Sequence, residues 1–396
     1  MADAAGVRQD KVRFIVADLE TTVGTFEFDP SNSGAGGPGG GALASSLRFP
    51  ARAESRLAPV DGEMIDNSEA LDGYAGAIAS TRGAVGMGGV LSTELRANGV
   101  TNVYPTHIKQ LIASGFEVTS YTSGTSTLVL NPSTKALTDW PGESAAVGPA
   151  GDGTDPGQRS PASMSIAEVL IDNNTKDEWL GAMGGVLATK IMLGTNGLVN
   201  YNSTITGQVA DNLFLDVSDT NLSGFGAEPT DQGKDPVVVK GATLVVKYTD
   251  ADVTDQVITP DRFRNLEIDL APNIVRVEDP TATNGYAVSP VFYDGAIGVT
   301  LQFADSSGYG NSVTGGTIMA GFKSGRGFLS IELTLTLDDS FTVDQTIKYD
   351  LPRIQYDAVR ENAEGARAFT FTGSAVRAER GNSTSPFTVT YVHGTA

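Results

Sequence analysis

Apolar and polar residues alternate along many segments of this chain, and this pattern predicts half-buried β-strands. The clearest case is 184–207, GGVLATKIMLGTNGLVNYNSTITG, where two alternating segments flank Asn196-Gly197. Asn-Gly is favoured in the tight type I′ turns of hairpins. After the turn, every second residue from Val199 to Ile205 lies on one largely apolar face, and the residues between them are polar. The stretch predicts a long hairpin with one buried face and one polar face.

The same alternation predicts strands in both halves of the chain. They cover residues 12–20, 47–53, 90–97, 126–132, 164–172, 296–305, 327–339 and 341–351. Residues 104–115 have helical spacing instead, because Ile108, Leu111 and Ile112 share a face. Pro105 suits a first helical position and Gly115 suits a stop. A weaker helix is predicted at 309–322.

Long stretches without sustained periodicity separate these elements. Residues 32–46 are rich in glycine and predict a surface loop, and 140–161 form an insertion rich in proline, glycine and aspartate. Residues 54–88 mix charges, glycines and small apolar side chains, which indicates an extended arm or loop. The chain holds 47 glycines and 18 prolines, so turns and loops are favoured over helical bundles.

The order of elements recurs along the chain. At 396 residues it exceeds a typical single domain, and its composition breaks at 223–236. A strand, a helix, a strand and a hairpin follow one another on both sides of that break, and Thr-Ile-Thr-Gly at 204–207 matches Thr-Phe-Thr-Gly at 370–373. We therefore predict a mainly β fold with two related β-barrel or sandwich domains, 1–222 and 237–396, joined by the linker 223–236. Each domain carries a short helix.

Charge and cysteine content exclude several functions. Acidic residues outnumber basic ones by 47 to 27, so the surface should repel nucleic acid phosphates and anionic membranes. Whether this acidity reflects a halophilic host stays open, because only 19% of the residues are charged. Cysteine is absent, which excludes disulfides, thiol nucleophiles and thiolate metal sites. Apolar runs are too short for a membrane span, and we expect a soluble protein without a signal peptide.

Catalytic motifs are not evident. His107 and His393 are the two histidines, and we expect His107 on a partly exposed helix surface and His393 near a mobile end. Residues 248–255 depart from the calcium loop of EF-hands, 232–236 from a phosphate-binding loop and 82–89 from a dinucleotide fingerprint. We therefore predict no enzyme, no cofactor and no metal, although two carboxylates at the separation of a glycoside hydrolase could hide among the 47 acids.

Several segments, taken in order, resemble the tail tube proteins of long, non-contractile phage tails. They are LETTVGTFEFDP (19–30), the arm 54–88, VLSTELRANG (90–99), VYPTHIKQLIASGF (103–116), LGAMGGVLATKIMLGTNGLVNYNSTITG (180–207) and residues 262–305. Each motif is short and degenerate, but together they cover most of the chain. The loop 32–46, the insertion 140–161 and the C-terminal extension 377–396 depart from the family pattern.

The resemblance implies a structural virion protein. Copies would form rings whose sheets line a pipe, and stacked rings would form the lumen through which double-stranded DNA leaves without specific binding. Two domains in one chain imply trimeric, pseudo-sixfold rings, whereas a single barrel would need hexameric rings. Further partners would be the tail terminator, tape measure and distal tail proteins. The protein would assemble in the host cytoplasm and reside in the virion tail.

Two groups of residues follow from this resemblance. The inter-ring stacking arm would use Leu57, Asp61, Glu63, Tyr74 and Arg82. The hairpins of the tube wall would present Lys190, Asn200, Asn202, Thr204, Glu332, Thr334, Thr336, Thr370 and Thr372. An acidic wall suits this role, because lysine and arginine would bind the DNA backbone and stall it.

Two other readings stay open. A carbohydrate-binding or depolymerising β protein of a virion or of secretion would use an acidic pair, yet Trp140 and Trp179 are the only tryptophans available as sugar platforms. A capsid-decorating or head-to-tail connector protein would share the fold class but not the stacking arm.

Overall fold

The structure is a computed structural model of the whole chain. It describes residues 12–20, 48–60, 64–65, 81–82, 86–96, 106–122, 127–132, 163–171, 177–194, 198–209, 242–249, 256–258, 262–270, 272, 276–278, 286–288, 297–304, 327–338, 344–362, 368–377 and 385–392. These residues form antiparallel strands and one helix, α1 (Thr106–Ala113), so the predicted mainly β class is confirmed.

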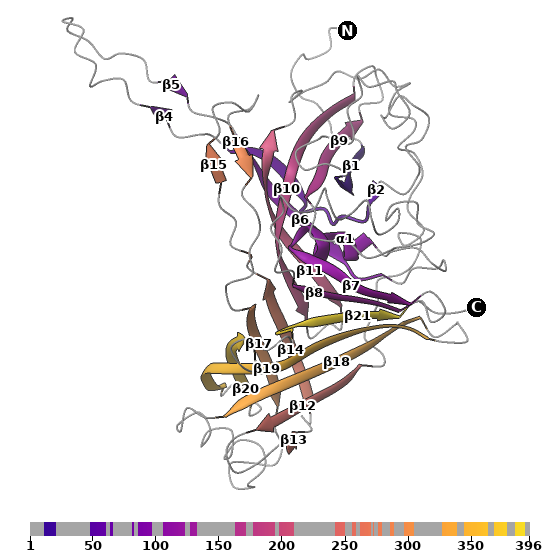
Figure 1. Cartoon of the computed structure of the whole chain (residues 1–396). Coiled ribbons are helices and arrows are strands. Elements are labelled where there is room, and N and C mark those ends of the chain that lie inside the picture. Colours follow the sequence, from indigo (N-terminus) through magenta and orange to yellow (C-terminus); the bar gives the residue numbers. More distant parts are fainter. Residues whose placement is uncertain are drawn as a thin grey trace, which may run out of the picture.

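One group of strands, the first wall, runs through both halves of the chain (Figure 1). In hydrogen-bonding order it consists of β6 (Gly86–Glu94), β11 (Val199–Val209), β10 (Asp177–Leu193), β14 (Arg262–Leu270), β17 (Ile297–Ala304) and β20 (Ala368–Ala375). Beside β6 lies β3 (Arg56–Val60). The first half of β10 also pairs with β9 (Met164–Ile171), which continues to β1 (Val12–Leu19) and β2 (Arg48–Phe49).

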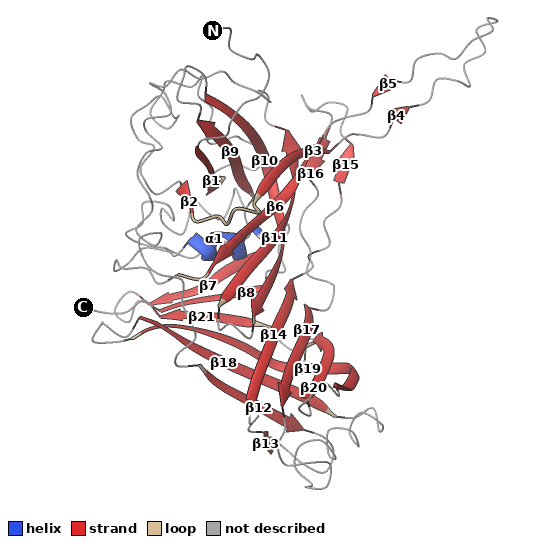
Figure 2. Ribbon diagram, turned by 180° about the vertical axis from the view of Figure 1, so that it is seen from behind, coloured by secondary structure: helices blue, strands red, loops and turns tan. Residues whose placement is uncertain are grey.

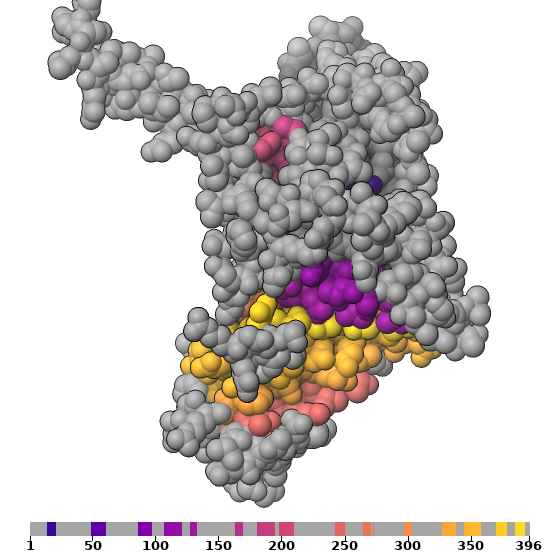
Figure 3. Space-filling model, in the orientation of Figure 1, coloured from indigo at the N-terminus to yellow at the C-terminus, as the bar shows by residue number. Residues whose placement is uncertain are grey.

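The remaining large strands form the second wall. Its order is β7 (Phe116–Thr122), β8 (Thr127–Pro132), β21 (Thr388–Val392), β19 (Gln345–Asn362), β18 (Phe328–Asp338), β12 (Thr243–Thr249) and β13 (Gln256–Ile258). Figure 3 shows this surface, from purple β7 and β8 through yellow β21 and orange β19 and β18 to salmon β12. The long strand β19 joins the walls, because its first half pairs with β21 and its second half with β20. The joined walls curl into a barrel-like sheet.

Among the described residues, a hydrophobic core lies between the walls. Strands of both halves contribute to it, for example Leu187 and Ile205 from the first wall and Ile331 and Leu351 from the second. Helix α1 packs inside, against β1, β7 and β10 (Figure 2). Burial of these apolar faces is the main stabilising term, at about 25 cal/mol for each Å² of apolar surface removed from water.

The hairpin at 184–207 is confirmed as β10 and β11, with an altered connection. Along β11, buried and partly exposed residues alternate as predicted. Leu193 pairs with Val199, however, and the Gly194 N–H donates to the Leu198 carbonyl over 3.4 Å. Three residues, 195–197, therefore connect the strands, whereas a type I′ turn centred on Asn196-Gly197 would require Thr195 to pair with Leu198. The predicted two-residue turn is therefore wrong. The observed pairing of the two strands differs from the predicted pairing by one residue.

The helix prediction is also confirmed. Ile108, Leu111 and Ile112 are buried on the face that the spacing predicted. Gly115 follows the helix with a φ of 91°, a left-handed conformation that glycine adopts without steric cost. The Ser114 N–H donates to the Gln110 carbonyl and closes the last turn.

The predicted arm 54–88 is too long at both ends. Val60 pairs with Gly86 and Leu57 with Gly89, so both ends belong to the β3–β6 ladder of the body. Beyond them, a small ladder of β4 (Met64–Ile65) and β5 (Thr81–Arg82) lies away from the rest of the described sheet in both ribbon views (Figures 1 and 2). A projecting segment can therefore begin only after Val60 and must end before Gly86.

The C-terminal segment is part of the second wall. Within the predicted extension 377–396, β21 pairs with both β8 and β19, and Phe387 is fully buried. The ladders β10–β14 and β8–β21 both join residues from the two predicted domains. The linker 223–236 lies outside the described residues, as do 32–46, 140–161 and 309–322, so the two-domain division stays a prediction.

A second small ladder pairs β15 (Arg276–Glu278) with β16 (Tyr286–Val288). Within the described part of the chain, no helix has the length and apolar character needed to span a membrane.

Candidate functional surface

The outer face of the first wall carries rows of polar side chains that cross it from strand to strand. Because paired residues of antiparallel strands point to the same side, the pairings define these rows. One row is Ser92, Asn202, Lys190, Asp269, Gly298 and Ser374. The next is Glu94, Asn200, Met192, Glu267, Thr300 and Thr372. Polar residues from both halves of the chain therefore share one continuous surface.

Most of the predicted wall residues lie on this surface. Asn200, Asn202 and Lys190 belong to the rows above, Thr204 is exposed on β11, and Thr370 and Thr372 lie on β20. The other three, Glu332, Thr334 and Thr336, lie on the outer face of β18 in the second wall. The structure thus brings six of the nine together and places the β18 group elsewhere.

Each wall holds a partly exposed lysine beside two acids. On the first wall, the Lys190 Nζ lies 2.9 Å from Glu267 Oε1 and 3.2 Å from Asp269 Oδ2. The hydrogen bonds to Glu267 and then Asp269 raise the pKa of Lys190 above its usual value. These carboxylates offset the charge of Lys190, so less of that charge is available to bind a phosphate group.

On the second wall, Lys348 Nζ lies 2.8 Å from Glu332 Oε2. Asp350 is paired opposite Glu332. Partial burial raises the pKa of Asp350, Lys348 lowers it, and the negative charge of Glu332 raises it further. The outer faces of both walls therefore pair a cation with a local excess of acid.

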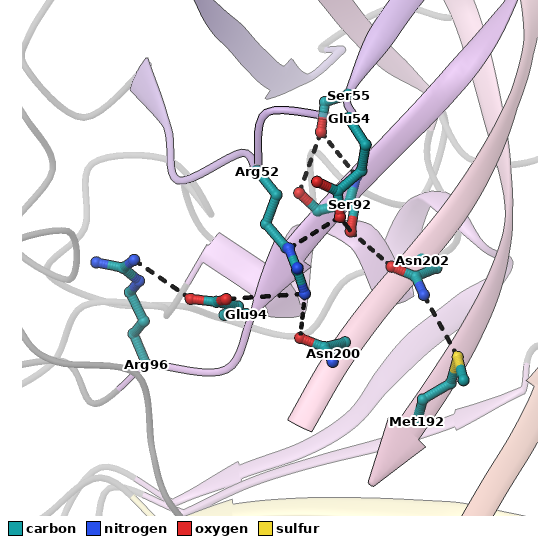
Figure 4. A network of polar contacts seen from close by, with 9 residues as sticks. All are labelled: Arg52, Glu54, Ser55, Ser92, Glu94, Arg96, Met192, Asn200 and Asn202. Atoms are coloured by element: carbon teal, nitrogen blue, oxygen red, sulfur yellow. Dashed lines mark hydrogen bonds and ion pairs between the residues drawn. The ribbon is translucent and has the colours of Figure 1, made fainter. Parts of the chain in front are cut away.

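A network of polar contacts joins the segment before β3 to strands β6 and β11 of the first wall (Figure 4). Arg52, in the segment before β3, contacts Glu54 Oε1 at 2.8 Å, Glu94 Oε1 at 3.8 Å and the Asn200 side-chain oxygen at 3.1 Å. Arg96 also pairs with Glu94, with 3.5 Å between Nη2 and Oε2. These contacts hold the segment before β3 against the polar side chains of β6 and β11.

Ser92 continues this network. Its hydroxyl lies 3.1 Å from Glu54 Oε1 and 2.6 Å from Asn202 Oδ1, and its backbone N–H donates to Ser55 Oγ. The Asn202 amide in turn lies 3.4 Å from the Met192 sulfur (Figure 4). Two of the predicted wall residues, Asn200 and Asn202, are thus held in place by neighbours that the sequence analysis did not single out.

The arm residues have separate outcomes. Leu57 is only 6% exposed and packs in the core, so its assignment to the stacking arm was wrong. Its place follows from the β3–β6 pairing, which sets Leu57 opposite Gly89 and makes it the one buried residue of β3. Arg82 lies on β5, opposite Met64. Asp61, Glu63 and Tyr74 lie outside the described residues.

His107 is buried, which corrects the expectation of a surface histidine. It is 3% exposed, and its ring lies 5.2 Å from that of Tyr201 and 6.3 Å from that of Tyr391. Its Nε2 atom has no hydrogen-bond partner. Burial lowers the pKa of His107 from 6.5 to about 3, so the folded protein holds this imidazole neutral at physiological pH.

The same interior region contains a chain of buried polar side chains. Thr93 Oγ1 donates to Gln110 Oε1, and Gln110 Nε2 donates to Ser203 Oγ. Ser203 lies 2.7 Å from Thr189 Oγ1, which lies 2.6 Å from Ser114 Oγ. These bonds connect α1 with β6, β11 and β10, and nearby the hydroxyls of Tyr201 and Tyr349 link the two walls. The hydrogen bonds of Gln110 and Ser114 hold α1 in its position between the walls.

A second buried group is Glu20. Its carboxylate accepts hydrogen bonds from the hydroxyls of Ser163 and Ser165 and from the Gly184 N–H, the last at 2.7 Å. Gly184 has a φ of 58° and lies at a bulge of β10. The carboxylate therefore holds the bulge, and its buried position gives it no access to a ligand.

Within the described residues, no group of three or more histidine, aspartate or glutamate side chains could hold a metal ion. The sequence matches no protein-family model and no curated protein.

Proposed function

We propose that this chain is a subunit of the tail tube of a long, non-contractile bacteriophage tail. Copies form rings, the rings stack, and double-stranded DNA passes through their lumen without specific binding. The observation that carries this proposal is the outer face of the first wall, which is polar across six strands drawn from both halves of the chain. Several motifs, taken in order along the chain, resemble tail tube proteins, and this resemblance also supports a structural role.

The first wall is the face that we assign to the lumen. Most of its exposed and partly exposed residues are hydroxyls, amides and acids, with Lys190 held between Glu267 and Asp269; Val90 of β6 is an exposed apolar residue on the same face. The phosphates of DNA bind to proteins mainly through lysine and arginine, with release of counterions. A wall whose lysine is already paired and whose surroundings are acidic gives DNA no such attachment, so the DNA slides.

The arrangement of copies follows from the two halves. If each half contributes one unit of wall, three chains make a pseudo-sixfold ring; if the chain acts as one unit, six are needed. Assembly in the host cytoplasm, residence in the virion tail and contacts with tail terminator, tape measure and distal tail proteins belong to the same proposal. We expect no catalytic activity and no cofactor.

Negative-stain microscopy of the purified protein tests the proposal directly. A tube subunit gives rings or filaments with a central channel. A compact monomer at all concentrations would contradict the proposal and favour the carbohydrate-binding reading, which glycan-array binding would then test.

Thiol labelling tests which face lines the lumen. The chain has no cysteine, so Thr204→Cys and Thr372→Cys each introduce a unique thiol on the first wall. In assembled tubes we expect both thiols to react at least tenfold more slowly with a 5-kDa maleimide polymer than in dissociated subunits, because the bulky reagent is excluded from the lumen. Thr334→Cys on the second wall is the matched control and should stay reactive. The opposite pattern would assign the second wall to the lumen.

Replacing residues 61–85 by Asn-Gly tests the stacking arm. Val60 and Gly86 are paired, so a two-residue turn can join β3 to β6 without disturbing the ladder. We expect the variant to keep the circular dichroism and thermal midpoint of the parent within a few degrees but to form no tubes longer than one ring. Tubes of normal length in electron micrographs would refute a stacking role for this segment.

A further inference from the structure

Two short motifs recur in the chain at one spacing. Gly-Tyr-Ala occurs at 73–75 and again at 285–287. Gly-Ala-Val-Gly at 83–86 corresponds to Gly-Ala-Ile-Gly at 295–298. The copies of both motifs are 212 residues apart, from 73 to 285 and from 83 to 295. Two motifs repeated at the same spacing indicate that this part of the chain occurs twice.

The ladders of the first wall repeat at the same spacing. Gly207 of β11 lies opposite Met87 of β6, and Gly373 of β20 lies opposite Val299 of β17. Met87 and Val299 are again 212 residues apart. Each of the two glycines also lies at a bulge of its other neighbour, which is β10 for Gly207 and β19 for Gly373. Because β3 precedes β6 and pairs with it, and β14 precedes β17 and pairs with it, β3 and β6 correspond to β14 and β17.

A small hairpin leaves the wall at each of these two places. The β4–β5 ladder lies between β3 and β6 in the chain, and the β15–β16 ladder lies between β14 and β17. The segments that carry them, 61–85 and 271–296, have nearly equal lengths of 25 and 26 residues. Four antiparallel pairings separate β3 from β14, so these two strands run in the same direction. Both segments therefore leave the wall at the same end (Figures 1 and 2).

We propose that residues 271–296 are a second stacking arm, equivalent to 61–85, and that they contact a second copy of this chain in the next ring. The inference rests on the proposed function and adds a second contact segment to it. Each chain then supplies two arms at one end of the wall, one for each half. Tyr74 of the first arm has its counterpart in Tyr286 of the second, and tyrosine is enriched in contact sites between proteins. A contact between a projecting segment and a different surface of the next copy is heterologous, and such contacts propagate into filaments.

The two small ladders have different surroundings within one copy. Strand β16 lies near β10 and β11 of the first half, whereas the β4–β5 ladder lies away from the rest of the described sheet (Figure 1). The order of the first wall explains this difference, because β14 is next to β10, while β3 pairs with β6 alone among the described strands. A brace that holds the two halves of one copy together is therefore the competing role for 271–296, and the experiments below separate it from stacking.

Photo-crosslinking tests the contact. Ala287→Cys introduces the only cysteine of the variant, which is labelled with a benzophenone maleimide and mixed with an equal amount of ¹⁵N-labelled parent before assembly. We expect mixed-isotope crosslinks in assembled tubes and none in dissociated subunits, and Ala75→Cys in the first arm should behave in the same way. Thr334→Cys on the second wall is the control and should give none. Crosslinks from residue 287 only within one copy, or equally in single rings of a variant without 61–85, would overturn the proposal.

Charge substitutions provide the second test. Tyr286→Asp and Tyr74→Asp should each raise the protein concentration needed for tube formation roughly tenfold or more, with thermal midpoints within a few degrees of the parent. Tyr286→Phe is the matched control, because it keeps the aromatic ring, and should leave that concentration nearly unchanged. Normal assembly of Tyr286→Asp would overturn the inference, and a lowered thermal midpoint of this variant would then indicate the brace. Tubes in the same sample would still support the proposed function. If the parent protein forms no tubes, both proposals fail.

Discussion

Acidification should destabilise the folded protein through His107, by roughly 4 kcal/mol between pH 6.5 and pH 3. The folded-state pKa of His107 is about 3, against 6.5 for an exposed histidine. Below pH 6.5 the unfolded chain therefore binds a proton that the folded chain does not, and each pH unit in this window costs about 1.4 kcal/mol. The full stability is present above pH 6.5 and is lost as the pH falls towards 3.

A matched variant isolates this contribution from that of the many carboxylates. His107→Phe keeps an aromatic ring between Tyr201 and Tyr391 but cannot be protonated. Urea unfolding at pH 7, 5.5 and 4 should show the parent losing about 3 kcal/mol more than the variant over this range. His393→Gln is the second control and should behave as the parent does. Parallel curves for the parent and His107→Phe would mean that the folded protein accepts the proton at little cost.

The strands and the helix could be predicted from the sequence because they depend on local periodicity. The alternation in β11 and β18 and the helical spacing in α1 each put one face in a common core, and the structure has those faces buried. The predicted order of a strand at 90–97 followed by a helix at 104–115 is also found, as β6 and α1. Periodicity cannot show which strand pairs with which, and the ladders β10–β14 and β8–β21 join residues far apart in sequence.

The errors have physical causes that a reader of the sequence can identify. The pattern assigns Leu57 to an arm because residues 54–88 show no sustained periodicity, and β3 is short and contains Pro59, a residue that marks strand edges as well as loops. His107 was placed on the surface, although it lies four residues before Leu111 and therefore on the apolar side of α1. Its burial also needed Tyr201 and Tyr391, which other strands bring to it.

The candidate surface could be predicted only residue by residue. Alternation identified Asn200, Asn202 and Thr204 as polar-face residues, and the structure has them on one face of β11. The clamp of Lys190 between Glu267 and Asp269 depends on the register of β10 against β14, which no local pattern specifies. Arg52 likewise reaches Glu94 and Asn200 only because its segment folds over β6.

Two of the motifs on which the family resemblance depends meet at one buried group. Glu20 belongs to the segment 19–30, and Gly184 and Gly185 belong to 180–207. The Glu20 carboxylate accepts the Gly184 N–H, and a Cβ atom on Gly185 would lie 2.5 Å from the Met164 carbonyl oxygen. The glycines let β10 bulge against β9, and the carboxylate holds the bulge. These motifs therefore have a structural reason whatever the protein assembles into.

Replacing Glu20 by leucine should consequently cost about 3–9 kcal/mol of unfolding free energy. The buried Ser163 hydroxyl, the Ser165 hydroxyl and the Gly184 N–H all lose this acceptor, and each such loss costs about 1–3 kcal/mol. Glu20→Gln keeps one acceptor oxygen in a side chain of the same shape and should cost less than half as much. Urea unfolding at pH 7 measures both variants. Because the bulge sets the course of β10, amide exchange in β9 and β10 should accelerate more in Glu20→Leu than exchange in β18, which is distant in the sheet order. Equal stabilities for the leucine and glutamine variants would mean that side-chain volume, and not the three hydrogen bonds, holds this part of the wall.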